Sequence, residues 1–282
     1  MTPQISVVRD PEYLRLATTL LQRMRLASPC GGIWEAADIQ WWSRQERSTD
    51  ADGQVFWLAD GEPVAAVIRT DFGLSVQCDV LVTGGDRDVV WAEALRHADA
   101  ATEFPVRDDD APAIAALTGA GYRPDGSPGV VASWLPAVER PPVPPLAGGF
   151  RLWSRAERPD REHPLARRNG PGVAESLLRC SLYRPELDLM VQAPDGQVAG
   201  YGLFWADPVT GVGLVEPMRT EDAFQRRGIA SHLLATGLER LAQLGCRRLK
   251  VSSDISLYQR AGFQPMASAS ATVYSRGACP GV

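Results

Sequence analysis

The sequence contains almost no lysine, no closely spaced cysteines and no long hydrophobic run. Lys250 is the only lysine among 29 basic residues, and 34 acidic residues give a formal net charge of −5. Bulk charge of this sign does not attract a polyanion, so we expect no nucleic-acid partner. No apolar run approaches the about 20 residues that span a bilayer, so we expect no membrane partner either.

The five cysteines are spread along the chain without a CxxC pair, which indicates neither a disulfide framework nor a zinc site. The three histidines have no metal-ligand spacing, so we expect no metal. Free thiols are typical of the reducing cytoplasm. We therefore predict a cytoplasmic protein.

The length of 282 residues, 45% of them hydrophobic, is enough for two domains with cores of their own. The segment 135–149 holds five prolines, which forbid a helix and favour an extended chain. We predict a linker over residues 136–149, a first domain over 1–135 and a second domain over 150–282.

The two predicted domains repeat each other. A strand, a tight turn and a second strand are predicted around Asp60-Gly61 and again around Asp195-Gly196, 135 residues later. A helix end at Ala120–Tyr122 recurs as Ala261–Phe263, 141 residues later. The hairpin and the helix end recur in the same order and at nearly the same offset, which favours a duplicated domain. The alternative is two unrelated hairpins and two common helix-end glycines.

Each half is predicted to contain the same elements in the same order. These are a first strand (5–9; 150–154), a hairpin, another strand (75–82; 212–219), an amphipathic helix (88–100; 229–244), a strand (104–107; 248–252), a short helix and a last strand that closes the half (130–135; 269–274). Hairpins followed by a β-α-β unit predict an α/β fold of the α+β mixed-sheet kind. We expect two domains in tandem, each a mostly antiparallel twisted sheet flanked by helices.

The segment Gln225–Ala230 lies between a predicted strand and a predicted amphipathic helix. Gly228 lets the backbone bend and approach a ligand closely. The first amides of the helix lack intrahelical partners, and the helix dipole is positive at this end. With Arg226 and Arg227 adding charge, the loop is a candidate pyrophosphate site.

This loop resembles motif A of the GNAT superfamily of acyl-CoA-dependent N-acetyltransferases, with Gln225, Gly228 and Ala230 at the matching positions. Downstream, Leu257–Phe263 resembles motif B, in which a tyrosine precedes a Gly-Phe pair. The resemblance is specific over about residues 187–276 and only topological over 1–135. The chain as a whole is similar to a tandem, two-domain GNAT protein.

The resemblance implies acetyl-CoA as the co-substrate, bound where two strands of the sheet splay apart. Backbone groups of Met218, Arg219 and Thr220 would then contact the pantetheine arm. The pyrophosphate would be held by the loop and the helix start, namely Gln225, Arg226, Arg227, Gly228, Ile229, Ala230 and Ser231. The family often carries an asparagine before the motif B tyrosine, which this chain lacks; Ser252 or Ser253 is the substitute.

Tyr258 matches the tyrosine that similar enzymes place beside the CoA sulfur, so it is the candidate general acid. Glu216 is the candidate base that takes the proton of the attacking amine. The structural alternatives are an ordinary buried helix aromatic and a carboxylate bonded to its neighbours. A β-bulge, common in the family at this strand, would change the face of Glu216. If water chains carry the proton instead, Glu221 or Asp222 merely caps the loop.

The first half has the segment Val82–Trp91 where motif A would stand. Asp86 and Asp88 would repel phosphates, so we expect a degenerate GNAT-like domain that does not bind CoA. We expect it to buttress the other half and wall the substrate pocket. The Arg-rich run 151–168, which includes His163, is interpreted as a solvated face because acidic residues balance it.

These features predict an N-acetyltransferase that transfers the acetyl group of acetyl-CoA to a primary amine of a small molecule. The amine attacks directly within a ternary complex. One alternative is an acetyltransferase like mycothiol synthase, and another is a CoA-binding or structural module without catalysis. The assembly is left open, with a homodimer as one option.

Overall fold

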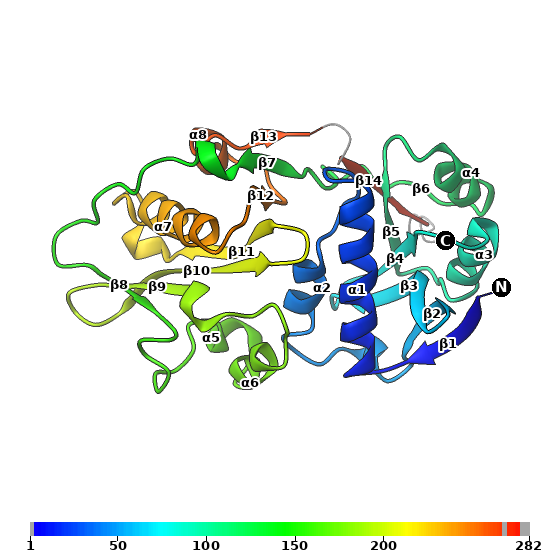
Figure 1. Ribbon diagram of the computed structural model, residues 1–282, viewed down its shortest axis with the longest axis horizontal. Coiled ribbons are helices and arrows are strands. Elements are labelled where there is room, and N and C mark those ends of the chain that lie inside the picture. The colour runs from blue at the N-terminus through cyan, green and yellow to red at the C-terminus, as the bar shows by residue number, and fades with distance from the viewer. Residues whose placement is uncertain (1–2, 267–269, 277–282) are drawn as a thin grey trace, which may run out of the picture. The chain divides into compact units, whose positions relative to one another are not determined.

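The computed structural model describes residues 3–266 and 270–276, which form two compact units (Figure 1). Unit 1 comprises residues 1–42, 46–131 and 267–282, and unit 2 comprises residues 43–45 and 132–266, apart from the undescribed positions. Each unit contains one seven-stranded mixed sheet, which confirms the predicted fold class.

The sheet of unit 1 has the strand order β1-β2-β3-β4-β5-β14-β6. Its elements are β1 (Gln4–Val8), α1 (Glu12–Ala27), α2 (Ala36–Trp42), the 3₁₀ turn η1 (Ser48–Asp50), β2 (Gln54–Ala59), β3 (Glu62–Asp71), β4 (Val76–Val82), α3 (Arg87–Arg96), β5 (Thr102–Arg107), α4 (Ala111–Gly119), β6 (Arg123–Pro124) and β14 (Ala271–Ser275). Val90 and Leu117, from α3 and α4, pack with alternate strand residues such as Val67. Ala66 and Ile68, whose side chains point to the other face of β3, are buried as well, so both faces of this strand are covered.

The sheet of unit 2 has the order β13-β7-β12-β11-β10-β9-β8. Its elements are β7 (Ser133–Pro136), the 3₁₀ turn η2 (Ala137–Glu139), β8 (Arg151–Ser154), α5 (Ala166–Asn169), α6 (Val173–Leu178), η3 (Pro185–Leu187), β9 (Asp188–Gln192), β10 (Val198–Asp207), β11 (Val212–Thr220), η4 (Asp222–Phe224), α7 (Ile229–Gln243), β12 (Arg248–Val251), α8 (Ser256–Arg260) and β13 (Gln264–Pro265). A Cβ at Gly237 of α7 would stand 2.1 Å from the Phe204 ring of β10. The glycine therefore allows α7 to lie close against the sheet.

Both predicted Asp-Gly hairpins are present. Asp60 and Gly61 have φ angles of 53° and 81° and join β2 to β3. Two consecutive residues with positive φ suit the right-handed twist of the flanking strands, which is why Asp-Gly was a usable signal. Gly196, with φ of 88°, lies in the corresponding turn between β9 and β10.

The prediction that each half closes with its own last strand is wrong. β7, from the first half of the sequence, pairs with β12 and β13 in the sheet of unit 2. β14, from the end of the chain, pairs with β5 and β6 in the sheet of unit 1. Ala269, where the second closing strand was expected to begin, lies outside the described residues. Because duplicated sheets present equivalent edges, the alternating pattern of a strand does not specify which copy it joins.

The Pro-rich segment 136–149 is not a linker between the two units, because it is part of unit 2. Ala137 is buried in the core of that unit, and its amide donates to the Arg247 carbonyl over 2.9 Å. Arg140 pairs with Glu239 of α7 over 2.7 Å. Proline rules out a helix, but an extended chain can still pack on a domain, so the predicted boundaries at 135 and 150 move to residues 131 and 132.

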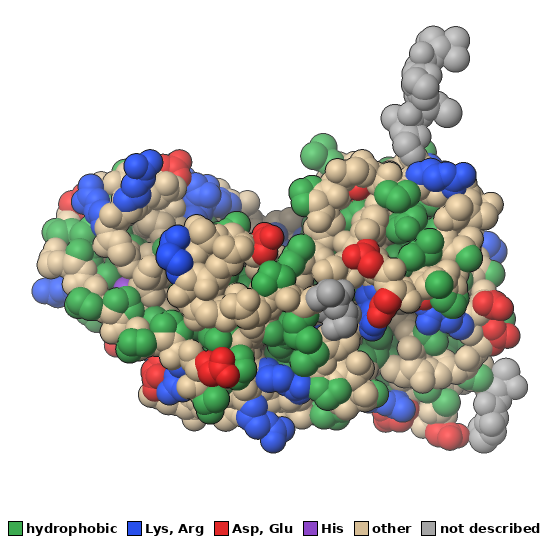
Figure 2. Space-filling model, turned by 90° about the horizontal axis from the view of Figure 1, so that it is seen from above, with side chains coloured by type: hydrophobic (Ala, Val, Ile, Leu, Met, Phe, Trp, Pro, Cys, Tyr) green, Lys and Arg blue, Asp and Glu red, His purple; other side chains and the backbone are tan. Residues whose placement is uncertain are grey.

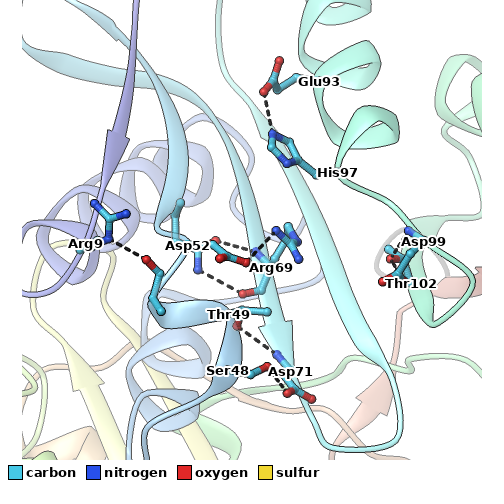
Figure 3. A network of polar contacts seen from close by, with 12 residues as sticks. Arg9, Ser48, Thr49, Asp52, Arg69, Asp71, Glu93, His97, Asp99 and Thr102 are labelled. Carbon is cyan, nitrogen blue, oxygen red and sulfur yellow. Dashed lines mark hydrogen bonds and ion pairs between the residues drawn. The ribbon is translucent and has the colours of Figure 1, made fainter.

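A polar network fixes the strand β3 to the preceding segment in unit 1 (Figure 3). The Asp71 amide donates to Thr49 Oγ1 over 3.3 Å, and its carboxylate accepts from the Ser48 hydroxyl. Arg69 lies 3.5 Å from the Asp52 carboxylate. These contacts tie the end of β3 to residues 48–52.

Acidic and basic side chains are interspersed over the face seen in Figure 2. Among the described residues, no helix is long and apolar enough to cross a bilayer. The same residues contain no group of three or more His, Cys, Asp or Glu side chains arranged to hold a metal ion.

Asp79 of β4 is a buried carboxyl without a cationic partner among the described residues. It is 2% exposed and accepts bonds from Trp34 Nε1 over 2.7 Å and from Gln77 Nε2 over 2.8 Å. Burial raises the pKa of Asp79 to about 7, and the charge of Asp38 adds to the rise. The folded chain therefore binds a proton here that the unfolded chain has released.

Replacement of Asp79 by Asn is expected to stabilise the chain at neutral pH. A carboxyl with a raised pKa stabilises the fold below its unfolded pKa of about 4, and this contribution is lost as pH rises toward about 7. The variant should unfold with a free energy on the order of 2 kcal/mol above that of the parent at pH about 8, and nearly equal to it at pH about 4. Urea unfolding at both pH values measures this difference. A variant that is equally destabilised at both values would contradict it.

Candidate functional site

The strands β11 and β12 splay apart in unit 2, as the family resemblance implied. They pair in parallel from Val212 to Leu214, opposite Arg248 to Lys250, and the pairing of the described residues ends there. β11 continues to Thr220 and stays paired with β10 on its other side. Its last five residues are half-buried. Backbone groups on the β12 side of this stretch are therefore available to an extended ligand.

A β-bulge interrupts β11 next to Glu216. Gly202 pairs with Met218 and Phe204 with Val215, so β11 has one residue more than β10 over this stretch. Trp205 Nε1 donates to the Glu216 carbonyl over 2.7 Å and holds the bulge in place. A bulge, which is common in the family at this strand, is thus present here, and it changes the directions of the side chains on either side of it.

The two candidate catalytic side chains lie close enough to interact. Tyr258 of α8 is 7% exposed and packs edge-on against Phe263, with ring centroids 6.0 Å apart. Burial, together with repulsion from the Glu216 carboxylate, raises the pKa of Tyr258 to about 12. The hydroxyl therefore keeps its proton at neutral pH and can donate it. Glu216 is half-buried.

The predicted phosphate loop forms a turn that ends at the N-terminus of α7. Gln225 Nε2 donates to Asp222 Oδ1 over 3.0 Å, and Arg226 has a positive φ of 59°. Gly228 is the N-cap residue, with φ of 79° and no side-chain cap. The first regular helix bond runs from the His232 amide to the Gly228 carbonyl. The amides before His232 are therefore left for an anion.

The residues expected to bind the cofactor are brought together around this loop. Arg226, Arg227, Gly228 and Ser231 are exposed, whereas Ile229 is buried and anchors the helix start. Met218, Arg219 and Thr220 are the last three residues of the strand β11, before the loop. Ala230 lies in the first turn of the helix α7. The structure thus assembles every predicted contact residue along one path, from the bulge in β11 to the helix N-terminus.

Two hydroxyls on this path are buried and lack hydrogen-bond partners among the described residues. They are Thr220 Oγ1, at the end of β11, and Ser252 Oγ, immediately after β12. Ser253, by contrast, is used locally, since its Oγ accepts from the Ile255 amide over 3.5 Å. Of the two serines considered as substitutes for the missing asparagine, Ser252 is the one with an unused polar atom that fits the role.

Sequence reasoning missed a buried network beneath the bulge. His163 is 4% exposed, so its assignment to a solvated face is wrong. Its Nδ1 accepts from the Leu165 amide over 3.1 Å, so Nε2 carries the proton and donates to Asp188 over 2.7 Å. The Tyr183 hydroxyl donates to the same carboxylate over 2.8 Å and its ring packs against Trp205. The basic and acidic residues of the run 151–168 balance each other, so the sequence pattern did not indicate that His163 is buried.

A small cavity of about 110 Å³ lies beside the loop, between α7, α8 and the Pro-rich segment. Ser231, Leu257 and Arg260 line it together with Pro142. His232 Nδ1 donates to the Pro144 carbonyl over 2.7 Å, which fastens the segment to α7. The prolines thus form one wall of the site, a role that the interpretation as a linker did not foresee.

Residues 151–263 match the model of the acetyltransferase (GNAT) family. Over these residues the chain is similar to the GNAT family. The N-acetyltransferase YjhQ of Escherichia coli, described as uncharacterized, is 30% identical over 101 residues, which are 34% of this chain and 55% of that protein. The match therefore spans about half the length of this curated relative.

The GNAT resemblance extends to the fold of the whole chain. A tandem GNAT protein from the clavulanic acid biosynthesis pathway has a TM-score of 0.66 at 16% identity, over 98% of this chain and 99% of that one. A GCN5-related N-acetyltransferase from Sphaerobacter thermophilus has a TM-score of 0.54 at 18% identity, over 97% of this chain and 94% of that one. The chain therefore has a tandem GNAT fold.

In unit 1 the corresponding helix N-terminus is capped by a side chain of its own. Asp86 caps α3, and its Oδ1 accepts from the amides of Asp88 over 3.0 Å and Val89 over 3.4 Å. A carboxylate already occupies the helix N-terminus that a phosphate would need. The positions of Asp86 and Asp88 therefore fit a GNAT-like domain without a pyrophosphate site.

Proposed function

We propose that the chain is an N-acetyltransferase that uses acetyl-CoA and acetylates a primary amine of a small molecule, with one working site in unit 2. The observation that carries the proposal is the splay of β11 and β12, next to which Tyr258 lies buried and close enough to Glu216 for that carboxylate to raise its pKa. The uncapped N-terminus of α7 follows on the same strand and suits a pyrophosphate. The orphaned Thr220 and Ser252 hydroxyls offer contacts to the arm between these two ends.

The side chains divide the chemistry of direct attack between them. An ammonium group with a pKa of about 10.4 must lose a proton before it attacks a thioester, and in this proposal the carboxylate of Glu216 accepts that proton. As the C–S bond breaks, negative charge develops on a sulfur whose thiol pKa is near about 8.5. Tyr258 donates a hydrogen bond to that sulfur and passes its proton as the thiolate leaves.

Release of free thiol from acetyl-CoA in the presence of a panel of primary amines tests the proposal. We expect thiol release that depends on the amine and yields the N-acetyl product by mass spectrometry. Acetyl-CoA binding without turnover of any amine would favour the non-catalytic module instead. Turnover confined to an aminosugar–cysteine conjugate would favour an enzyme similar to mycothiol synthase.

Replacement of Glu216 by Gln is expected to move the pH profile of kcat/KM at both ends. Loss of the base should lower the rate about 10- to 100-fold near neutral pH, where the amine is mostly protonated. Loss of the negative charge also lowers the pKa of Tyr258, so the alkaline limb should shift to lower pH.

Glu221→Gln is the matched control, because Glu221 lies just beyond β11 and pairs with Arg168 over 2.9 Å. We expect that variant to keep the profile of the parent. An unchanged profile in Glu216→Gln would remove Glu216 from the proton path and leave that role to water.

A further inference from the structure

The strands β4 and β5 of unit 1 also splay, and a cavity opens between them. Their pairing ends after Gln77 and Glu103. A cavity of about 400 Å³ lies beyond this point, in the range of small-molecule sites. Its wall is largely apolar and aromatic, with Met24, Trp34 and Trp91 among the lining residues.

Among the described residues, the charged side chains that line the cavity are paired with opposite charges, with the exception of one carboxylate. Arg87 pairs with Asp110, Arg107 donates to Asp109 over 2.8 Å, and Arg25 donates to Glu35 over 2.9 Å. Asp79 also lines the cavity, but its described partners are the neutral Trp34 and Gln77. An ionised carboxylate buried without a cation is costly, and a ligand cation would offset that cost.

A second polar group in the wall lacks a partner. Trp91 is 6% exposed, and its Nε1 makes no hydrogen bond within the described residues. An indole N–H is a donor only, so the matching group on a ligand is an acceptor. The two groups together call for a ligand that has a cation at one point and a hydrogen-bond acceptor at another.

We propose that this cavity binds a small organic amine that carries a hydrogen-bond acceptor, with its ammonium group paired to Asp79. Trp34 and Trp91 provide aromatic surface for its body and attract a cation through their ring faces. The carboxylate of Asp86 caps the N-terminus of α3, so unit 1 offers no pyrophosphate site that would bring acetyl-CoA to the bound amine. Unit 1 then binds the amine without acetylating it, which goes beyond the transferase activity proposed for unit 2.

Calorimetric titration of the full chain with phenylalaninamide, in the absence of acetyl-CoA, tests the proposal. This probe has an ammonium group and an amide carbonyl, and 3-phenylpropanamide is the same molecule without the ammonium. We expect phenylalaninamide to bind, with a Kd at least about tenfold lower than that of 3-phenylpropanamide. We expect Asp79→Asn, which keeps the shape and removes the charge, to weaken phenylalaninamide binding by at least about tenfold.

Glu216→Gln separates this cavity from an amine site in unit 2. Binding that Asp79→Asn weakens and Glu216→Gln leaves unchanged supports the proposal, whether or not the chain turns over any amine. Binding that only Glu216→Gln weakens would place the amine in unit 2 and overturn it. Equal affinity for the two probes, or no binding of phenylalaninamide, would overturn it as well. The thermal unfolding curve of Asp79→Asn shows that the variant is folded.

Discussion

Replacement of Tyr258 by Phe is expected to lower kcat by at least about 100-fold while KM for acetyl-CoA changes less than about threefold. The hydroxyl has a pKa of about 12, so it is a proton donor throughout the physiological range. It makes no hydrogen bond within the described residues, so its loss leaves no buried partner unsatisfied. The ring remains to pack against Phe263. The loss should therefore fall on the step in which the sulfur leaves.

Tyr122→Phe is a matched control for this prediction. Tyr122 follows the equivalent Ala-Gly pair in unit 1, and its hydroxyl makes one long bond of 3.4 Å to the Asp99 carbonyl. We expect kcat of that variant to stay within about twofold of the parent. Steady-state kinetics of both variants, with thermal unfolding as the check on folding, decides the matter. Full kcat in Tyr258→Phe would show that the thiolate leaves without an acid.

Replacement of Ser231 by Asp is expected to weaken acetyl-CoA binding at least about 100-fold and to stabilise the protein slightly. Ser231 is exposed in the first turn of α7, where the helix has no side-chain cap. A carboxylate there interacts favourably with the helix dipole, worth about 0.3–1 kcal/mol. The same carboxylate repels the pyrophosphate and competes for its amides. Affinity and stability should therefore change in opposite directions.

Ser231→Asn is the control, because it has nearly the shape of Asp without the charge. We expect its acetyl-CoA affinity to stay within about fivefold of the parent, since one exposed neutral side chain costs little. Calorimetry gives the affinities and thermal unfolding gives the stabilities. Equal losses of affinity in both variants would indicate a steric effect. Unchanged affinity in Ser231→Asp would place the pyrophosphate elsewhere.

Local features of the site could be predicted from the sequence because each depends on a few adjacent residues. Gly228 is where the chain adopts a positive φ before α7, and the apolar spacing of that helix gave its extent. Tyr258, on the short helix α8, was selected because the segment that ends in Gly262-Phe263 resembles motif B of the family, and its catalytic role stays a prediction. The splay and the bulge followed from the family resemblance and not from the residues themselves.

The features that the sequence did not reveal depend on contacts between distant segments. The exchange of β7 and β14 is decided by which sheet edge each strand meets, and both edges offer the same backbone groups. The packing of the Pro-rich segment depends on Arg140 and on the Pro144 carbonyl finding partners on α7. Burial of His163 depends on Asp188, which lies 25 residues further on.

Calorimetric titration of acetyl-CoA into the full chain tests most directly the claim that unit 2 holds the one working site. Because the carboxylate of Asp86 occupies the helix N-terminus of α3, we predict one site per chain, and we predict its loss in Ser231→Asp. Two sites per chain would show that unit 1 binds the co-substrate despite that carboxylate. No binding would contradict the transferase assignment itself.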